Sequence, residues 1–194
     1  MATNDYHFIT HWRVKSTLEE INDVLGSAPD LVRWWPSVYL DVKEIERGST
    51  DGVGRVISLF TKGWLPYTLR WSFKVTEVNY PTGFRLDAIG DFVGRGIWTF
   101  EQEGDFVNLT YDWKISAEKG LLKTFSFIMK PIFSMNHEWA MARGFDSLLL
   151  ELQRRHATTP EERARIPAPP APTFAWMIKK GSRAEPSMPK NVIS

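Results

Sequence analysis

The chain has 194 residues, a formal net charge of +1 and no cysteine. This length predicts one domain that buries enough apolar surface to fold without disulfides or structural metals. The missing cysteines exclude disulfide bonds, thiolate zinc sites and cysteine nucleophiles, and the near-neutral charge argues against nucleic-acid binding through phosphate contacts.

The first elements are expected to be a strand and two short helices. Residues 6–15 alternate between two faces, which predicts a strand. Two overlapping capping-box spacings follow, from Ser16 to Glu19 and from Thr17 to Glu20, and they predict a helix over residues 18–25. A second short helix is expected over residues 29–34, with proline at its start.

Targeting signals are missing from the N-terminal residues. Residues 1–7 lack the basic and apolar regions of a secretory signal. The longest apolar runs, such as residues 148–150, fall far short of the ~20 residues that a membrane-spanning helix needs. We therefore expect a cytoplasmic protein without an integral membrane segment.

The region from residue 38 to residue 117 predicts six antiparallel strands, because five turn signals divide it. Two segments, 67–75 and 107–115, alternate strictly between apolar and polar residues. Such segments are typical of a sheet that is covered on one face only.

Residues 121–156 predict one long helix, with a break or kink expected just before Pro131. Asp146 is the one charged residue in its expected apolar stripe, and Arg143 lies one turn before it. The apolar stripe that should face the sheet consists of Leu121, Phe125, Ile128, Ile132, Met135, Trp139, Ala142 and Leu150.

Three stretches resemble motifs of a known superfamily. Residues 31–36 end in Trp-Trp-Pro, residues 90–101 contain a Gly-Asp and a Gly-x-Gly-x-Trp pattern, and residues 136–144 resemble the start of a final helix. Together they are similar to the START-like or Bet v 1-like (SRPBCC) superfamily, in its bacterial polyketide cyclase/dehydrase-like branch. The resemblance covers residues 6–156. It implies an α+β helix-grip fold, in which a curved seven-stranded antiparallel sheet wraps around a long C-terminal helix, with two short helices after strand 1.

The resemblance also implies a tunnel between sheet and helix that takes up hydrophobic or aromatic small molecules. The composition agrees, because 9 Trp, 12 Phe and 5 Tyr residues exceed what a small core needs. From the strands we expect the ligand-binding residues Tyr67, Leu69, Trp71, Phe73, Trp98, Phe100, Tyr111 and Trp113. From the helix we expect Phe125, Ile128, Ile132, Met135 and Trp139.

The leading hypothesis is binding of a lipid- or polyketide-like molecule in this cavity. The alternative is a polyketide cyclase or dehydratase that uses the same cavity, with Tyr111 as the candidate catalytic hydroxyl. His137 and Glu138 open a zinc-protease pattern, but position 141 is Met, and the helical wheel places His137 on the outer side. We therefore expect no metal and no other cofactor.

The C-terminal region differs in composition from the rest. We divide the chain into a helix-grip domain, residues 1–156, and a Pro-rich extension, residues 157–194, which holds seven of the twelve prolines. Residues 166–172 should be extended. An apolar group then follows and suggests a third hypothesis, a protein-interaction module or self-association through the tail. This group consists of Phe174, Trp176, Met177 and Ile178.

Overall fold

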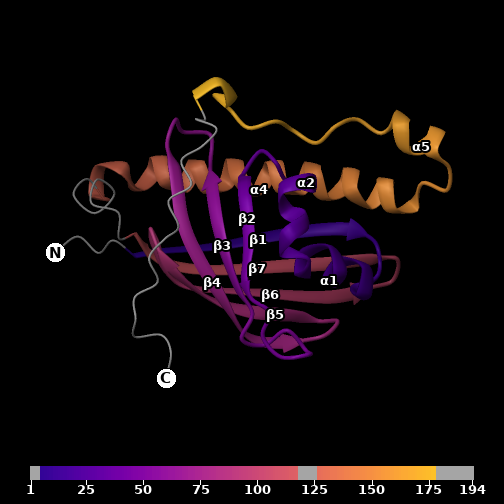
Figure 1. Ribbon diagram of the computed structural model, residues 1–194, viewed down its shortest axis with the longest axis horizontal. Coiled ribbons are helices and arrows are strands. Elements are labelled where there is room, and N and C mark those ends of the chain that lie inside the picture. The colour runs from indigo at the N-terminus through magenta and orange to yellow at the C-terminus, as the bar shows by residue number, and fades with distance from the viewer. Residues whose placement is uncertain (1–4, 118–125, 178–194) are drawn as a thin grey trace.

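The computed structural model describes residues 5–117 and 126–177. Seven strands form one antiparallel sheet in the order β1-β7-β6-β5-β4-β3-β2, and a long helix lies along it (Figure 1). This arrangement confirms the predicted helix-grip α+β fold, including all six strands expected between residues 38 and 117. The strands are β1 (Asp5–Lys15), β2 (Tyr39–Glu46), β3 (Val56–Lys62), β4 (Thr68–Asn79), β5 (Gly83–Gly90), β6 (Phe92–Glu103) and β7 (Phe106–Ala117).

The short helices after β1 follow the local sequence closely. Helix α1 (Leu18–Gly26) begins after Thr17, whose hydroxyl accepts a hydrogen bond from the Glu20 backbone N–H at 3.3 Å. The second expected helix consists of a 3-10 turn, η1 (Ala28–Asp30), followed by α2 (Leu31–Trp34). These elements close one end of the sheet and bring the two tryptophans of the Trp-Trp-Pro motif into the core.

The strand faces obey the predicted alternation. On β7 the side chains of Leu109, Tyr111, Trp113 and Ile115 are buried, and the residues between them are more exposed. Trp98 on β6 lies opposite Tyr111 in the strand register. One face of the sheet is therefore covered, and its aromatic residues share a single interior.

Helix α4 (Ser126–His156) runs through Pro131 without interruption, so the expected break is wrong. Pro131 is the sixth residue of the described helix, so it removes one interior backbone hydrogen bond, and the other hydrogen bonds of the helix hold the backbone across that position. Pro131 is also exposed, so its ring is not part of the packed core of the described residues.

The apolar stripe expected to face the sheet is not the buried face of α4 in the structure. The buried positions are instead Met141, Ser147, Leu148, Glu151 and Leu152. Met135 is 56 % exposed, and Asp146 forms a partly exposed ion pair of 3.2 Å with Arg143. The helix carries apolar residues on both faces, which makes its inward side ambiguous from periodicity alone.

The C-terminal residues turn back along α4 (Figure 1). Helix α5 (Pro160–Arg165) begins with a capping box between Thr159 and Glu162. Residues 166–177, here called the strap, then run without helix to the short 3-10 turn η2 (Ala175–Met177). The Arg154 guanidinium donates to the Pro167 carbonyl, which ties the strap to α4.

Candidate functional site

Two cavities lie between the sheet and the helices. The smaller has a volume of about 130 Å³ and lies between α4 and the strands β1, β3, β4 and β7. The larger has a volume of about 740 Å³ and lies between α1, the η1–α2 segment and the strands β4, β5 and β6. Exposed residues of its rim include Thr50, Asp51 and Tyr80, so the larger cavity opens to solvent near the β2–β3 loop.

A shared wall separates the two cavities. It consists of the five residues that line both of them: Trp35, Tyr39, Trp71, Tyr111 and Met141. Trp35 packs directly on the backbone of α4, since a Cβ added at Gly144 would lie 2.1 Å from its Cζ2 atom. The absence of a side chain at Gly144 thus lets an indole form the centre of this wall.

Most of the strand residues expected to bind a ligand do line a cavity. Trp71 and Tyr111 belong to the wall, and Phe100 is fully buried in the core and lines neither cavity. The smaller cavity is lined by Tyr67, Leu69 and Trp113, and the larger by Phe73 and Trp98.

Three of the five helix residues expected in the site line neither cavity. Ile132, Met135 and Trp139 line neither cavity, because the inward face of α4 is rotated from the expected one. Phe125 and the side chain of Ile128 lie outside the described residues. The residues that α4 contributes instead are Phe133, Asn136, His137, Ala140 and Met141.

Tyr111 stands between two indoles. Its ring stacks on Trp98 at a centroid distance of 4.3 Å and lies 5.6 Å from Trp113. Gly96 makes room for it, since a Cβ there would come within 2.7 Å of the Tyr111 hydroxyl oxygen. Burial raises the pKa of Tyr111 well above its usual value. At neutral pH its hydroxyl is therefore a hydrogen-bond donor and no base.

His137 lines the smaller cavity, so its expected position on the outer side of the helix is wrong. The imidazole stacks on the Phe8 ring at 4.2 Å. Its Nε2 atom is buried and has no hydrogen-bond partner among the described residues. Burial lowers the pKa of His137 to about 4, so the ring is neutral at pH 7.

Lys62 brings a positive charge to the smaller cavity, although its side chain is only 3 % exposed. Its Nζ donates to the carbonyl oxygen of Thr173 at 2.5 Å and to the hydroxyl oxygen at 2.7 Å. The Phe174 ring centroid lies 5.3 Å from the same nitrogen. Burial lowers the pKa of the Lys62 ammonium.

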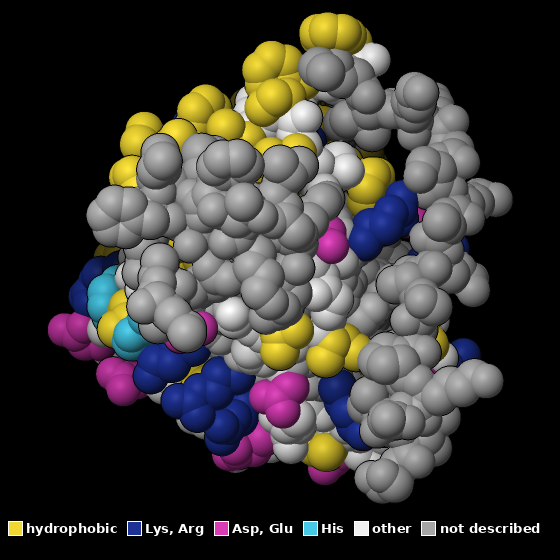
Figure 2. Space-filling model, turned by 90° about the vertical axis from the view of Figure 1, so that its left-hand side faces the viewer, with side chains coloured by type: hydrophobic (Ala, Val, Ile, Leu, Met, Phe, Trp, Pro, Cys, Tyr) yellow, Lys and Arg dark blue, Asp and Glu magenta, His cyan; other side chains and the backbone are white. Residues whose placement is uncertain are grey.

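The strap therefore contacts the body beside the smaller cavity. The Thr173 hydroxyl also lies within hydrogen-bonding distance of the Trp64 carbonyl oxygen, at 3.1 Å. Phe174 is half-exposed and Trp176 is 83 % exposed, so neither is buried against the body. The Met177 side chain and Ile178 lie outside what the structure describes. Figure 2 shows this end of the molecule, where hydrophobic side chains gather over the upper part and charged ones over the lower part.

Sequence reasoning missed three central residues. Trp35 belongs to the Trp-Trp-Pro motif, and its place in that motif is the sequence feature that could have indicated a position in the site. Lys62 was visible only as the start of a turn, and its burial depends on a residue 111 positions away. Asn136 accepts from the Leu65 backbone N–H at 3.3 Å, and this contact likewise has no local sequence pattern.

Comparison with known structures defines the fold. The Zhui aromatase/cyclase from Streptomyces sp. R1128 has a TM-score of 0.62 at 14% identity, covering 79% of this chain and 97% of that one. The chain shares the helix-grip fold of this aromatase/cyclase. Two further structures share this fold. A protein from Thermus thermophilus has a TM-score of 0.59 at 12% identity, covering 75% of this chain and 99% of that one. A norcoclaurine synthase from Thalictrum flavum has a TM-score of 0.52 at 16% identity, covering 78% of this chain and 98% of that one.

These likenesses confirm the resemblance read from the three motifs at the level of fold. No protein-family model and no curated protein sequence matches the chain. Among the described residues, no helix combines the length and apolarity that crossing a bilayer requires.

The neutral His137 gives the protein a predictable response to acid. Because its pKa falls from 6.5 in the unfolded chain to about 4 in the folded one, the unfolded chain binds more protons between these values. We expect the free energy of unfolding to decrease as the pH falls from 6.5 toward 4. In the variant His137→Phe the unfolding free energy should depend less steeply on pH, by an amount that corresponds to up to one bound proton. Urea denaturation at several pH values measures this slope. An unchanged slope would contradict the burial of a neutral imidazole, and the exposed His11 offers the control His11→Phe.

Proposed function

We propose that the chain binds a hydrophobic or aromatic small molecule of lipid- or polyketide-like character in the larger cavity, between its sheet and the α1–α2 segment and beside Met141 of α4. The observation that carries the proposal is the larger cavity, whose volume of about 740 Å³ falls within the range of small-molecule sites. Its inner surface is formed by apolar and aromatic side chains of β4, β5 and β6, including Phe73, Leu86 and Trp98. Its charged groups, Asp23, Asp51 and Arg55, come from α1 and the β2–β3 region.

This distribution suits an apolar molecule with few polar groups. Arg55 is already engaged, since it donates to Glu44 at 2.6 Å and to the Gly26 carbonyl at 3.0 Å. The interior offers aromatic faces and few charges, so burial of apolar surface would supply most of the binding free energy. The solvent-exposed rim residues provide a route of entry.

The test uses the neutral fluorescent probe N-phenyl-1-naphthylamine with the full chain. We expect saturable binding with quenching of tryptophan fluorescence, because Trp35, Trp71 and Trp98 line the cavity. Val78→Trp places an indole in the larger cavity and should weaken binding about tenfold or more. Val32→Trp, at an exposed position of α2, should leave binding unchanged. Absence of saturable binding to the unmodified chain would contradict the proposal.

A second candidate function is a cyclase- or dehydratase-type enzyme, and the position of Tyr111 favours it. A protonated hydroxyl in the shared wall can donate to a substrate carbonyl oxygen as negative charge develops there. One fold neighbour is an aromatase/cyclase by name. With a poly-β-ketone thioester as substrate, we expect cyclised product by mass spectrometry and at least a 100-fold loss of rate in Tyr111→Phe. Retained probe binding in that variant separates catalysis from binding, and unchanged turnover would remove the catalytic role of Tyr111.

A further inference from the structure

Among the described residues, the smaller cavity has one charged side chain and no opposite charge beside it. Among the described residues that line it, Lys62 is the only charged one, and no Asp, Glu or Arg belongs to the lining. The structure places no carboxylate of the described residues within 4.0 Å of the Lys62 nitrogen. The ammonium instead donates to two neutral oxygens of Thr173.

The buried Lys62 ammonium has neutral hydrogen-bond partners, which do not compensate its charge fully. Taking a charge out of water is costly, and neutral acceptors recover only part of that cost. An ammonium has three N–H donors, and Thr173 accepts from two of them. An anion that entered the cavity beside Lys62 would meet a positive charge that no carboxylate of the described residues neutralises, and a low effective dielectric strengthens the attraction.

The other polar groups of this cavity are also suited to an anion. The Oδ1 atom of Asn136 accepts from the Leu65 N–H, which fixes the amide so that its NH₂ group remains as donor. Burial raises the pKa of Tyr67 to about 12, so its hydroxyl stays protonated. The remaining lining is mainly apolar or aromatic, as at Phe8, Leu69 and Phe133.

The volume restricts the size of the occupant. At about 130 Å³ the cavity is close to the engineered apolar cavity of ~150 Å³ that binds benzene. One aromatic ring with one small substituent therefore matches it, whereas a long chain does not.

We propose that the smaller cavity binds a single-ring aromatic carboxylate, or a polyketide fragment of that size and charge, through an ion pair with Lys62. This inference rests on the proposed function and adds the charge and size of the ligand. The ring would lie among the aromatic side chains of β1, β4 and α4. The carboxylate would take the third ammonium donor or replace Thr173.

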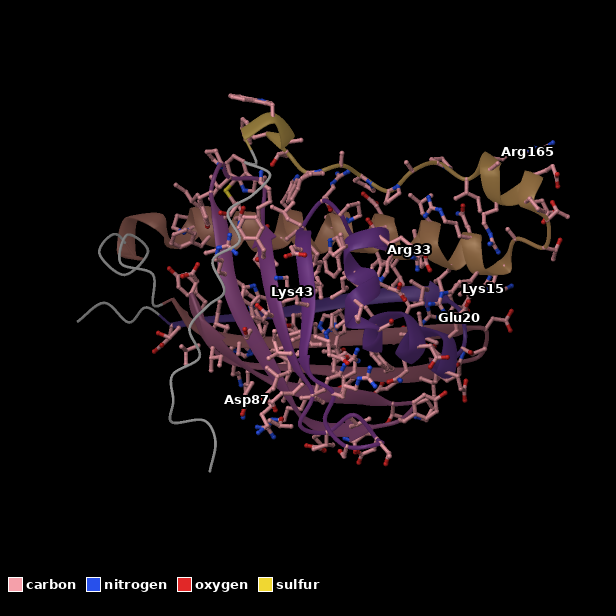
Figure 3. All side chains as sticks on the ribbon, viewed as in Figure 1. Lys15, Glu20, Arg33, Lys43, Asp87 and Arg165 are labelled. Carbon is pink, nitrogen blue, oxygen red and sulfur yellow. The ribbon has the colours of Figure 1, made fainter. Side chains whose placement is uncertain are left out.

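The test compares benzoate with benzyl alcohol, which has nearly the same shape and no charge. By titration calorimetry the unmodified chain should bind benzoate at least tenfold more tightly than benzyl alcohol, as expected for a charged buried hydrogen bond. Lys62→Met should lower benzoate affinity about tenfold or more and change benzyl alcohol affinity little. Lys43→Met, on the edge strand β2 (Figure 3), is the matched control and should change neither.

The outcomes separate the two proposals. Equal affinity for the two probes in the unmodified chain, or unchanged benzoate binding in Lys62→Met, would overturn the ion pair. If N-phenyl-1-naphthylamine still binds in that case, the general binding function stands. If it fails to bind as well, both proposals are wrong. Lys62→Arg retains the charge and should keep the preference for benzoate, so the test does not depend on the folding of Lys62→Met alone.

Discussion

Replacing Trp35 with alanine is expected to lower the free energy of unfolding by about 3–5 kcal/mol. The indole is buried in the centre of the shared wall and contacts several aromatic neighbours. Its ring lies 5.4 Å from that of Trp34, 5.9 Å from that of Trp12 and 5.2 Å from that of Tyr39. Removing it deletes these contacts and leaves an empty space that the surrounding rings can fill only in part.

The measurement is urea denaturation of Trp35→Ala beside Trp176→Ala. Trp176 is 83 % exposed, so its truncation should change stability by less than about 0.5 kcal/mol. The Trp35→Ala variant should also join the two cavities into one, because Trp35 lines both. A longer neutral probe should therefore bind Trp35→Ala more tightly than the unmodified chain. A small loss of stability would contradict the close packing of the Trp35 indole between the two cavities.

The strands could be predicted because their signals are local. Turn residues and strict alternation on β4 and β7 depend only on neighbours in the sequence, and the buried rings of Trp71 and Tyr111 follow from that alternation. The existence and extent of the sheet could therefore be predicted from the sequence. The strand residues that line the cavities could be predicted in the same way.

The inward face of α4 could not be obtained in the same way. The helix is apolar on two sides, and periodicity alone selects neither. Asp146 lay within the expected stripe, and its partly exposed pair with Arg143 marks that stripe as the outer face. The buried face contains Ser147 and Glu151, two polar residues that a search for an apolar stripe rejects. His137 was missed for the same reason, since it lies on the rejected face.

The charge at Lys62 depends on tertiary contacts. A lysine at the end of a strand is usually solvated, whereas this one donates hydrogen bonds to Thr173 of the strap, which returns to the end of β3. Such a contact joins residues 62 and 173, and no local pattern connects them. The polar half of the candidate site is therefore a property of the folded chain.

Replacing Arg33 with methionine is expected to lower the free energy of unfolding by about 3 kcal/mol at pH 7. Glu151 of α4 is only 2 % exposed, and Arg33 of α2, which is labelled in Figure 3, donates to both of its oxygens, at 2.6 and 2.8 Å. Without Arg33 the buried carboxylate keeps Arg155, at 3.2 Å, as its partner. The expected loss lies at the lower end of the range for a broken buried pair because this second partner remains and because the Arg33 side chain is itself 52 % exposed.

The pH dependence of this loss tests its cause. Burial raises the pKa of Glu151, but the hydrogen bonds and charges of Arg33 and Arg155 outweigh burial and hold that pKa below its usual value. The unfolded chain therefore takes up the proton first, so the stabilising contribution is present above pH 4.5 and is lost as the pH falls below it. In Arg33→Met the pKa of Glu151 should rise, because only Arg155 then counteracts the effect of burial.

The stability difference between the unmodified chain and Arg33→Met should consequently be largest near pH 7 and narrow toward pH 4. Urea denaturation at both pH values measures it. In the double variant Arg33→Met/Glu151→Leu no buried carboxylate remains, so most of the lost stability should return at pH 7. A difference that is constant with pH, together with no recovery in the double variant, would show that Arg33 stabilises the α2–α4 contact through the packing of its methylene groups instead of its charge.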